Sequence, residues 1–215
     1  MELPTLQDLK EAAAVVCRFM SPTAQYNWPL LSRQGGCELW AKHENHTPVG
    51  SFKVRGSLVY LDWLRKTHPE TRGVISATRG NHGQSLAFAA QRFGLEAVVV
   101  VPFGNSREKN DAMRGLGAEV VEYGEDFHEA DHHADTLARA RGLHRVSSFN
   151  RLLVSGAGTW ALELFTAVSE LDVVYVPIGL GSGACGVAGA RNALGLRTQI
   201  VGVVSAAAPC YARSF

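Results

Sequence analysis

Short runs of apolar residues alternate along the chain with longer stretches in which apolar residues recur at helical spacing. Four runs have the length and composition of buried strands: VISA (74–77), AVVVVP (97–102), DVVYVP (172–177) and QIVGVV (199–204). Between them, apolar residues three or four positions apart predict helices. This alternation predicts an α/β protein with parallel sheets whose faces are covered by helices.

The remaining elements follow from local signals. A helix is predicted to begin after Thr5, because threonine caps helices and Asp8 stands at the third helical position. Ser21-Pro22 ends that helix. Further helices are predicted over residues 51–64, 84–93, 106–115, 126–141, 156–169 and 184–194. Shorter strands are predicted in CELWAKHE (37–44), AEVVEY (118–123) and HRV (144–146).

Composition narrows the class of protein. Hydrophobic residues make up 46% of the 215 residues and charged residues 19%, a usual balance for a globular protein. The formal net charge of +1 gives no sign of a nucleic-acid or membrane surface. The N-terminus has no apolar secretory core, and the chain has no run of 18 apolar residues. We therefore expect a cytoplasmic protein without nucleic-acid or membrane partners.

A glycine-rich turn joins the strand at 172–177 to the next predicted helix. Gly179, Gly181 and Gly183 allow a tight turn and let several backbone N–H groups approach an anion. The N-terminus of the following helix adds the positive end of its dipole. These features predict a phosphate site, although such a turn can also bind nothing.

The same turn raises the alternative of a dinucleotide-binding fold. Gly181, Gly183 and Gly186 fit G-x-G-x-x-G, a pattern that is weak by itself. That fold uses an acidic residue about 20 positions further on to hold the ribose. Here the strand at 199–204 is followed by Ser205 and three alanines. The sequence therefore argues against a nicotinamide dinucleotide.

Two further segments carry candidate chemistry. Ser51-Phe52-Lys53-Val54-Arg55-Gly56 places a lysine at a helix start, where desolvation favours a neutral, nucleophilic amine. By itself a lysine is more often a solvated surface charge. Thr78-Arg79-Gly80-Asn81-His82-Gly83-Gln84 follows the strand at 74–77, at the edge where open α/β sheets bind ligands. Its donors suit a carboxylate, and an ordinary capped turn is the alternative.

The ordered set of motifs resembles the pyridoxal-phosphate enzymes of the tryptophan-synthase-β-like fold (fold type II), in their threonine and serine dehydratase branch. The resemblance covers nearly all of the chain. It is carried by Thr47-Pro48, residues 51–56, Gly80-Asn81-His82-Gly83-Gln84, Gly115-Leu116-Gly117-Ala118-Glu119-Val120, Ala157-Gly158-Thr159 and Pro177-Ile178-Gly179-Leu180-Gly181-Ser182-Gly183. Each motif is weak alone, but their order is specific.

The resemblance implies a role for each matching position. Lys53 would hold pyridoxal 5'-phosphate and move the α-proton of the substrate. Phe52 would pack against the cofactor ring, and Asn81 would bind its hydroxyl. The phosphate would lie on Gly179, Leu180, Gly181, Ser182 and Gly183. The substrate would lie against Ser51, Thr78, Arg79, Gly80 and His82.

The resemblance also implies the architecture. We expect two open, mostly parallel twisted sheets with helices on both faces. Residues 1–72 and 151–215 would form a large cofactor-binding domain, and residues 73–150 a small mobile domain that closes over the substrate. We expect the C-terminal part of the large domain, including a neutral group near the pyridine nitrogen, to lie beyond residue 215. The family also suggests a homodimer.

The implied activity is β-elimination on a hydroxy amino acid such as L-threonine or L-serine, giving a 2-oxo acid and ammonia. One alternative is another elimination or replacement within the fold, on 3-hydroxyaspartate, phenylserine or diaminopropionate. Another is a truncated, inactive chain that acts at most as a binding module.

Arg79 departs from the family pattern. It stands where the branch usually has a small residue, often serine, which is the second base of the racemases. Arginine stays protonated and cannot act as that base, so racemisation is disfavoured. We hypothesise that Arg79 binds a second carboxylate on an acidic substrate.

The stretch His128-Glu129-Ala130-Asp131-His132 matches the zinc-protease pattern H-E-x-x-H. Ala130, Ala134 and Ala138 define the apolar face of this predicted helix, and the histidines fall on the opposite side. A catalytic zinc would also need a third ligand in a cleft. We therefore predict a solvated helix face and no metal.

Overall fold

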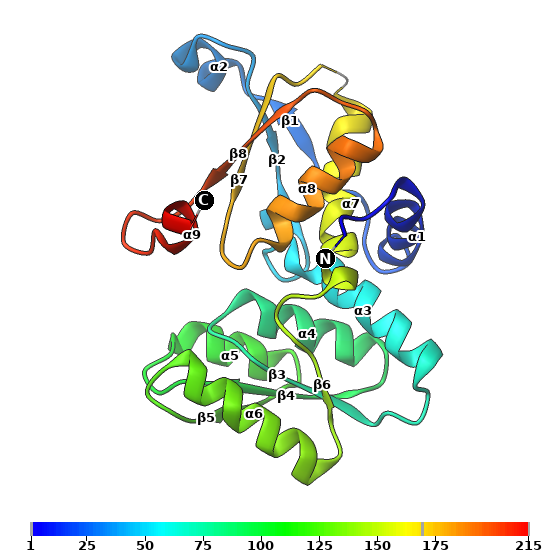
Figure 1. The fold of residues 1–215 in the computed structure, drawn as a ribbon, viewed down its shortest axis with the longest axis vertical. Helices are drawn as coiled ribbons and strands as arrows, with labels where there is room; N and C mark the ends of the chain where they lie inside the picture. Colours follow the sequence, from blue (N-terminus) through cyan, green and yellow to red (C-terminus); the bar gives the residue numbers. More distant parts are fainter. Residues whose placement is uncertain (1, 169, 215) are drawn as a thin grey trace.

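Two groups of elements lie one above the other in the computed structural model, which describes residues 2–168 and 170–214 (Figure 1). The lower group comprises β3 (Gly73–Ala77), α4 (Asn81–Arg92), β4 (Glu96–Val101), α5 (Arg107–Gly115), β5 (Glu119–Glu122), α6 (Phe127–Arg141) and β6 (His144–Arg145). Its strands form one parallel sheet in the order β5-β4-β3-β6.

The upper group contains the two ends of the chain. It comprises α1 (Leu6–Val16), β1 (Gln25–Asn27), α2 (Pro29–Gly35), β2 (Trp40–Lys42), the 3-10 helix η1 (Glu44–His46), α3 (Lys53–Thr67), α7 (Arg151–Ala167), β7 (Val173–Pro177), α8 (Ser182–Ala193), β8 (Gln199–Val203) and α9 (Cys210–Ser214). Strands β1 and β2 pair antiparallel, whereas β7 and β8 pair parallel. Helix α3 lies where the upper group meets the lower group (Figure 1).

The lower sheet is covered on both faces, which explains why β3 is buried at every residue. Alternate side chains of a strand point to opposite faces. On one face Ile75 and Val98 pack with the alanines of α6, and on the other Val74 and Val99 pack with α4. The continuous apolar runs in the sequence reflect this double burial.

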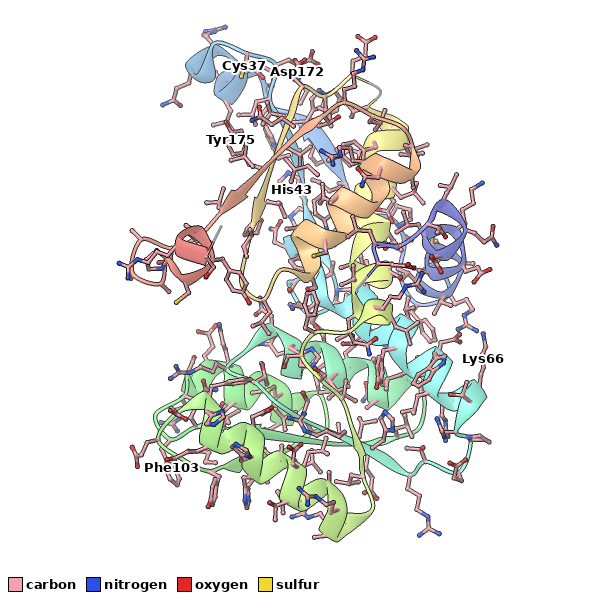
Figure 2. All side chains as sticks on the ribbon, in the orientation of Figure 1. Cys37, His43, Lys66, Phe103, Asp172 and Tyr175 are labelled. Carbon is pink, nitrogen blue, oxygen red and sulfur yellow. The ribbon has the colours of Figure 1, made fainter. Side chains whose placement is uncertain are left out.

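The β7–β8 pair has two different faces. Val174 and Val176 of β7 are buried in a cluster that includes Val187 of α8. Tyr175 between them is 70% exposed and projects outward (Figure 2). Within the described residues, helix α8 therefore covers one face of this pair, and the other face is open.

The helices of the upper group approach one another through glycines. A Cβ atom on Gly156 of α7 would lie 2.5 Å from the carbonyl oxygen of Arg55 in α3. A Cβ atom on Gly186 of α8 would lie 2.7 Å from the backbone nitrogen of Gly158 in α7. Helix α7 thus touches α3 and α8 backbone to backbone, which brings the start of α3 close to the start of α8.

The structure confirms the α/β fold with parallel sheets. It also confirms the capping box of α1, in which Thr5 and Asp8 each accept a bond from the other's backbone N–H. Helix α7 begins five residues earlier than predicted, because the Asn150 side chain caps it at Leu152 N. Helix α4 begins three residues earlier, at Asn81.

Several short elements were not predicted: β1, α2, η1 and α9. Residue 169 of the predicted helix, and residues 1 and 215 of the predicted large domain, lie outside the described residues. The division into domains at 72/73 and 150/151 stays a prediction. In the described ranges, no helix combines the length and apolar character needed to cross a membrane.

Candidate active site

Lys53 is the first residue of α3, and its backbone is held from the preceding turn. The Thr47 hydroxyl accepts a bond from Ser51 N at 2.8 Å and donates to Ser51 O at 2.9 Å. The Ser51 hydroxyl in turn accepts from Lys53 N at 3.3 Å. The turn before α3 is therefore fixed by side chains, even though Phe52 caps the helix with no side-chain bond of its own.

The Lys53 side chain reaches the glycine-rich turn. Its Nζ donates to the Ser182 hydroxyl at 3.0 Å, although the two residues are 129 positions apart. Removal from water penalises the charged amine, so burial lowers the pKa of Lys53 below its usual range. A lysine of this kind is a better nucleophile than a surface lysine.

Helix α8 begins at Ser182 directly after the glycine turn. Gly181 has φ +96°, a left-handed conformation that favours glycine. The first N–H groups of a helix have no intrahelical acceptor, so the amides of Ser182, Gly183 and Ala184 are available to an anion. A Cβ atom on Gly183 would lie 3.0 Å from the Phe52 ring, so glycine here leaves room for that aromatic side chain.

The polar loop after β3 leads into the N-terminus of α4. Thr78 is buried, and its hydroxyl accepts a bond from Gly80 N at 3.1 Å. Because α4 begins at Asn81, the amides of Asn81 and His82 lie in its first turn and have no intrahelical acceptor. The side chains of Arg79 and Asn81 are exposed.

His82 is buried, and its protonation follows from its partners. Its Nε2 lies 3.1 Å from the Ser76 hydroxyl, which donates to Val146 O at 2.7 Å. Since the serine proton is used in that bond, His82 Nε2–H is the donor to Ser76. Burial, followed by the charges of Lys53 and Arg145, lowers the pKa of His82 to about 3. His82 is therefore a neutral imidazole at physiological pH.

The structure brings Phe52 and Lys53 against Ser182 and Gly183. His82 lies close enough to Lys53 for the lysine charge to lower its pKa. Gly179 and Leu180 are exposed beside this contact. The exposed side chains of Arg79 and Asn81 make no hydrogen bond to Lys53 within the described residues.

Sequence reasoning missed Lys109, in the first turn of α5. A Cβ atom on Gly80 would lie 2.9 Å from both Cδ and Nζ of Lys109. The lysine therefore lies over the loop between β3 and α4. No sequence spacing points to this contact, because it depends on how α5 packs on the sheet.

The H-E-x-x-H stretch lies on α6 as predicted. His128 and His132 are exposed, while Ala130, Ala134 and Ala138 are buried. In the portion of the chain that the structure describes, histidine, cysteine and acidic side chains do not gather in groups of three that could hold a metal ion.

The profile of one protein family, described as pyridoxal-phosphate dependent enzyme, matches residues 16–215. The chain belongs to this family. In this pyridoxal-phosphate enzyme family it is 36% identical over 181 residues to the L-threonine dehydratase biosynthetic IlvA of Haemophilus influenzae, an alignment that covers 84% of this chain and 35% of that protein. The chain spans between about a third and a half of the length of such curated relatives.

Solved structures of the family have the same fold. A threonine deaminase from T.th. superposes with a TM-score of 0.90 at 32% identity, covering 98% of this chain and 68% of the other. A pyridoxal 5'-phosphate-dependent aspartate racemase superposes with a TM-score of 0.85 at 30% identity, covering 93% and 62%. These matches confirm the fold type II architecture. They also confirm that threonine dehydratases are relatives of this chain.

The residues present fit the family's cofactor. Lys53 supplies a partly buried amine of lowered pKa beside a hydroxyl at 3.0 Å. The first turn of α8 supplies free amides and a positive dipole end, the chemistry that a phosphate needs. At Gly183 a side chain would meet the Phe52 ring, so this part of the cradle accepts only glycine without displacement.

Proposed function

We propose that this chain forms the cofactor site of a pyridoxal-phosphate-dependent ammonia-lyase that acts on a hydroxy amino acid such as L-threonine or L-serine. The observation that carries the proposal is the 3.0 Å contact between Lys53 Nζ and Ser182 Oγ, because it joins the amine to the phosphate cradle. The relatives named L-threonine dehydratase and L-threonine ammonia-lyase support this reaction.

Each predicted residue has a part in the proposed site. Lys53 would hold the cofactor through its amine and would accept the α-proton of the substrate. Phe52 would pack against the cofactor ring, and Asn81 would bind its hydroxyl. Gly179, Leu180, Gly181, Ser182 and Gly183 would hold the phosphate. When bound, the cofactor supplies an electron sink for the charge that develops as the α-proton leaves.

The loop after β3 binds the substrate carboxylate in this proposal. The amides of the first turn of α4 have no intrahelical acceptor and would bind this anion, and Ser51, Thr78 and Gly80 would contact the substrate beside them. Neutral His82 donates to Ser76 and leaves the carboxylate to these amides. Loss of the β-hydroxyl and hydrolysis then give a 2-oxo acid and ammonia.

The proposal also includes the division into domains, the oligomeric state and the location of the protein. Residues 73–150 form a small mobile domain that closes over the substrate, and residues 1–72 and 151–215 belong to the large domain. The protein acts as a homodimer in the cytoplasm. Two observations support the domain boundaries. Strands β3 to β6 form one parallel sheet, and this unit follows α3 and precedes α7 in the chain.

The test is chemical trapping of the cofactor. Pyridoxal phosphate is added to the 215-residue chain, the adduct is reduced with borohydride, and the modified peptide is identified by mass spectrometry. We expect modification at Lys53 and its loss in Lys53→Ala. Lys66→Ala is the matched control, since Lys66 lies in the same helix but is exposed and paired with Asp62.

Modification of another lysine, or of none, would contradict the proposal. Turnover is then assayed as 2-oxo acid released from L-threonine or L-serine. Trapping at Lys53 without turnover would instead favour the inactive binding module.

A second candidate substrate carries an additional carboxylate, as 3-hydroxyaspartate does. Two cations favour it: Arg79 in the substrate loop, and Lys109, which lies over Gly80. The similar structure of an aspartate racemase lends further support. Arg79→Ser should lower the preference for 3-hydroxyaspartate over L-threonine, measured as the ratio of kcat/KM values. An unchanged ratio would remove this candidate.

A further inference from the structure

Arg55 is the largest fully buried side chain in the described residues, and it stands two positions after Lys53 on α3. Its guanidinium makes two forked ion pairs. Toward Glu44, Nε and Nη2 donate to the two carboxylate oxygens at 2.8 and 2.9 Å. Toward Glu163, Nη1 and Nη2 donate at 2.6 and 3.0 Å. Both edges of the planar fork are therefore used.

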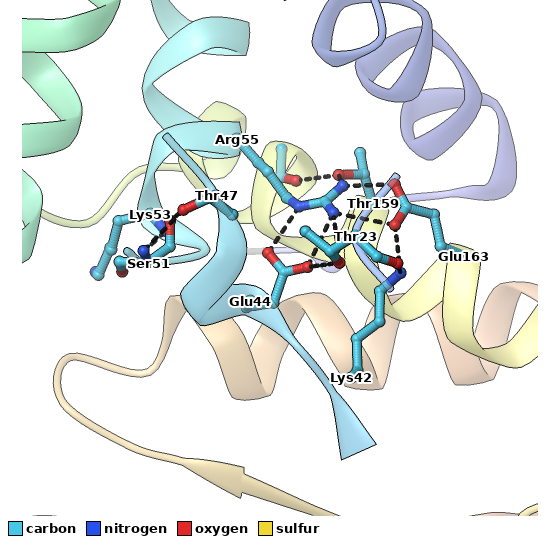
Figure 3. A network of polar contacts seen from close by, with 10 residues as sticks. Thr23, Lys42, Glu44, Thr47, Ser51, Lys53, Arg55, Thr159 and Glu163 are labelled. Carbon is cyan, nitrogen blue, oxygen red and sulfur yellow. Dashed lines mark hydrogen bonds and ion pairs between the residues drawn. The ribbon is translucent and has the colours of Figure 1, made fainter. Parts of the chain in front are cut away.

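The partners of Arg55 come from separate parts of the chain (Figure 3). Glu44 lies in η1, and Glu163 lies in α7. Thr159, also in α7, accepts a further bond from Arg55 Nη1 at 3.1 Å. Lys42 of β2 donates to Glu163 Oε2 at 2.6 Å, which balances two positive charges with two negative ones. The network thus ties α3 to the segment before it and to α7.

Such a network contributes more to the orientation of the helix than to the stability of the protein. Removing two charges from water costs about as much as their attraction returns, so a buried ion pair is weak evidence for stability. Forked bonds are directional, however, and fix how a helix is rotated about its axis. At Gly56, α3 meets the backbone of α7 with no side chain between them. The forked bonds therefore add a directional contact at this point of the helix pair.

We propose that Arg55 is a positioning residue for Lys53: the Glu44–Arg55–Glu163 network sets the rotation of α3 so that Lys53 Nζ faces Ser182. The inference rests on the proposed role of Lys53. Arg55 touches neither cofactor nor substrate in this proposal. It acts through the helix backbone, because side chains two positions apart on a helix point to nearly opposite sides. Figure 3 shows Lys53 and Arg55 on α3 with their separate partners.

The test compares Arg55→Lys with Leu61→Ala. Arg55→Lys keeps the positive charge but cannot form two forks. Leu61→Ala removes a fully buried side chain from the same helix, outside the network, and so destabilises the protein without touching Arg55. Two properties are measured: Kd for pyridoxal phosphate, from tryptophan fluorescence, and the rate of Lys53 acetylation by acetic anhydride without cofactor, from mass spectrometry.

We expect Arg55→Lys to raise Kd by roughly tenfold or more, since small displacements of a site residue have effects of this order. Acetylation of Lys53 should become faster, because the amine leaves its partly buried contact with Ser182. Leu61→Ala should lower the thermal midpoint and leave both properties unchanged. If Arg55→Lys does not fold, Glu44→Gln takes its place. This variant loses one charge at the border of the network, and we expect it to raise Kd and to speed acetylation of Lys53.

Equal changes in Leu61→Ala and the network variants would overturn the proposal, because they would reflect stability alone. Unchanged Kd and acetylation in both network variants would also overturn it. If the wild-type chain does not bind pyridoxal phosphate while Lys53 acetylation still depends on Arg55, the proposed function fails and the positioning role stands.

Discussion

The lower and upper groups of elements are held together in different ways. In the lower group, valine and alanine side chains of β3 and β4 interdigitate with α4 and α6 on the two faces of the sheet. In the upper group, α3, α7 and α8 meet at glycines, with backbone against backbone. The upper group also has an apolar cluster between α7, α8 and β7. Its closest helix contacts, however, require that side chains be absent.

The difference teaches where the molecule tolerates change. Side chains can move to other rotamers when a neighbour grows, whereas backbone atoms cannot move without shifting a whole helix. These backbone contacts involve Gly56, three residues after Lys53, and Gly186, three residues after Gly183. This part of the candidate site therefore depends on the less tolerant kind of packing.

The largest expected effect sharpens this comparison in the upper group. In Gly156→Ala, the new Cβ would lie 2.5 Å from Arg55 O. Because only backbone movement relieves this clash, we expect a loss of about 3 kcal/mol or more in the free energy of unfolding. Urea denaturation measures it. Gly115→Ala is the control, because no atom lies within 4 Å of its Cβ, and a comparable loss there would contradict the argument.

An intermediate effect concerns the buried imidazole of the lower group. His82 has a folded-state pKa of about 3, below the ordinary value of 6.5. Between these values the unfolded chain binds the extra proton, so stability is complete above pH 6.5 and falls as the pH decreases. The slope approaches about 1.4 kcal/mol per pH unit.

The measurement is urea denaturation from pH 7 to pH 4 for the wild type and for His82→Gln, which cannot titrate. We expect the wild type to lose stability more steeply with falling pH. Parallel curves would show that His82 does not carry this linkage.

The smallest expected effect tests whether a clash with side chains costs less stability than a clash with backbone. In Gly83→Ala of the lower group, the new Cβ would approach Met113 Sδ at 2.3 Å and Thr78 Cγ2 at 2.6 Å. Val99 Cγ1 is a third neighbour, at 3.0 Å. All three are side-chain atoms, and methionine adapts readily. Part of the cost is also offset by the better helix propensity of alanine. We expect a loss of about 1 kcal/mol, and a loss equal to that of Gly156→Ala would remove the distinction between the two groups.

Much of the fold could be predicted because its signals are local. The continuous apolar runs of β3 and β4 predict strands buried on both faces, and Thr5 with Asp8 predicts the start of α1. Helix α2 was missed because its seven residues show no apolar periodicity, which agrees with the finding that none of them is buried. The early start of α7 carried a signal, since Asn150 is a common capping residue.

The candidate site was less predictable from local patterns. Its segments could be joined only through their order along the chain, which is typical of a known family. Lys109 and the partners of Arg55 were missed, because such contacts depend on the packing of helices that are distant in sequence. Arg55 itself belongs to the family motif at residues 51–56, but nothing in the sequence indicates that it is wholly buried.

The contact between Lys53 and Ser182 also bears on how the protein folds. It closes a loop of 129 residues, so the entropy of bringing its ends together must be met by the packing of everything between them. The contact therefore forms only when the packing of α3, α7 and α8 outweighs this entropy. Cofactor uptake would then report the completion of folding, and by mass action the bound cofactor would stabilise both groups of elements at once.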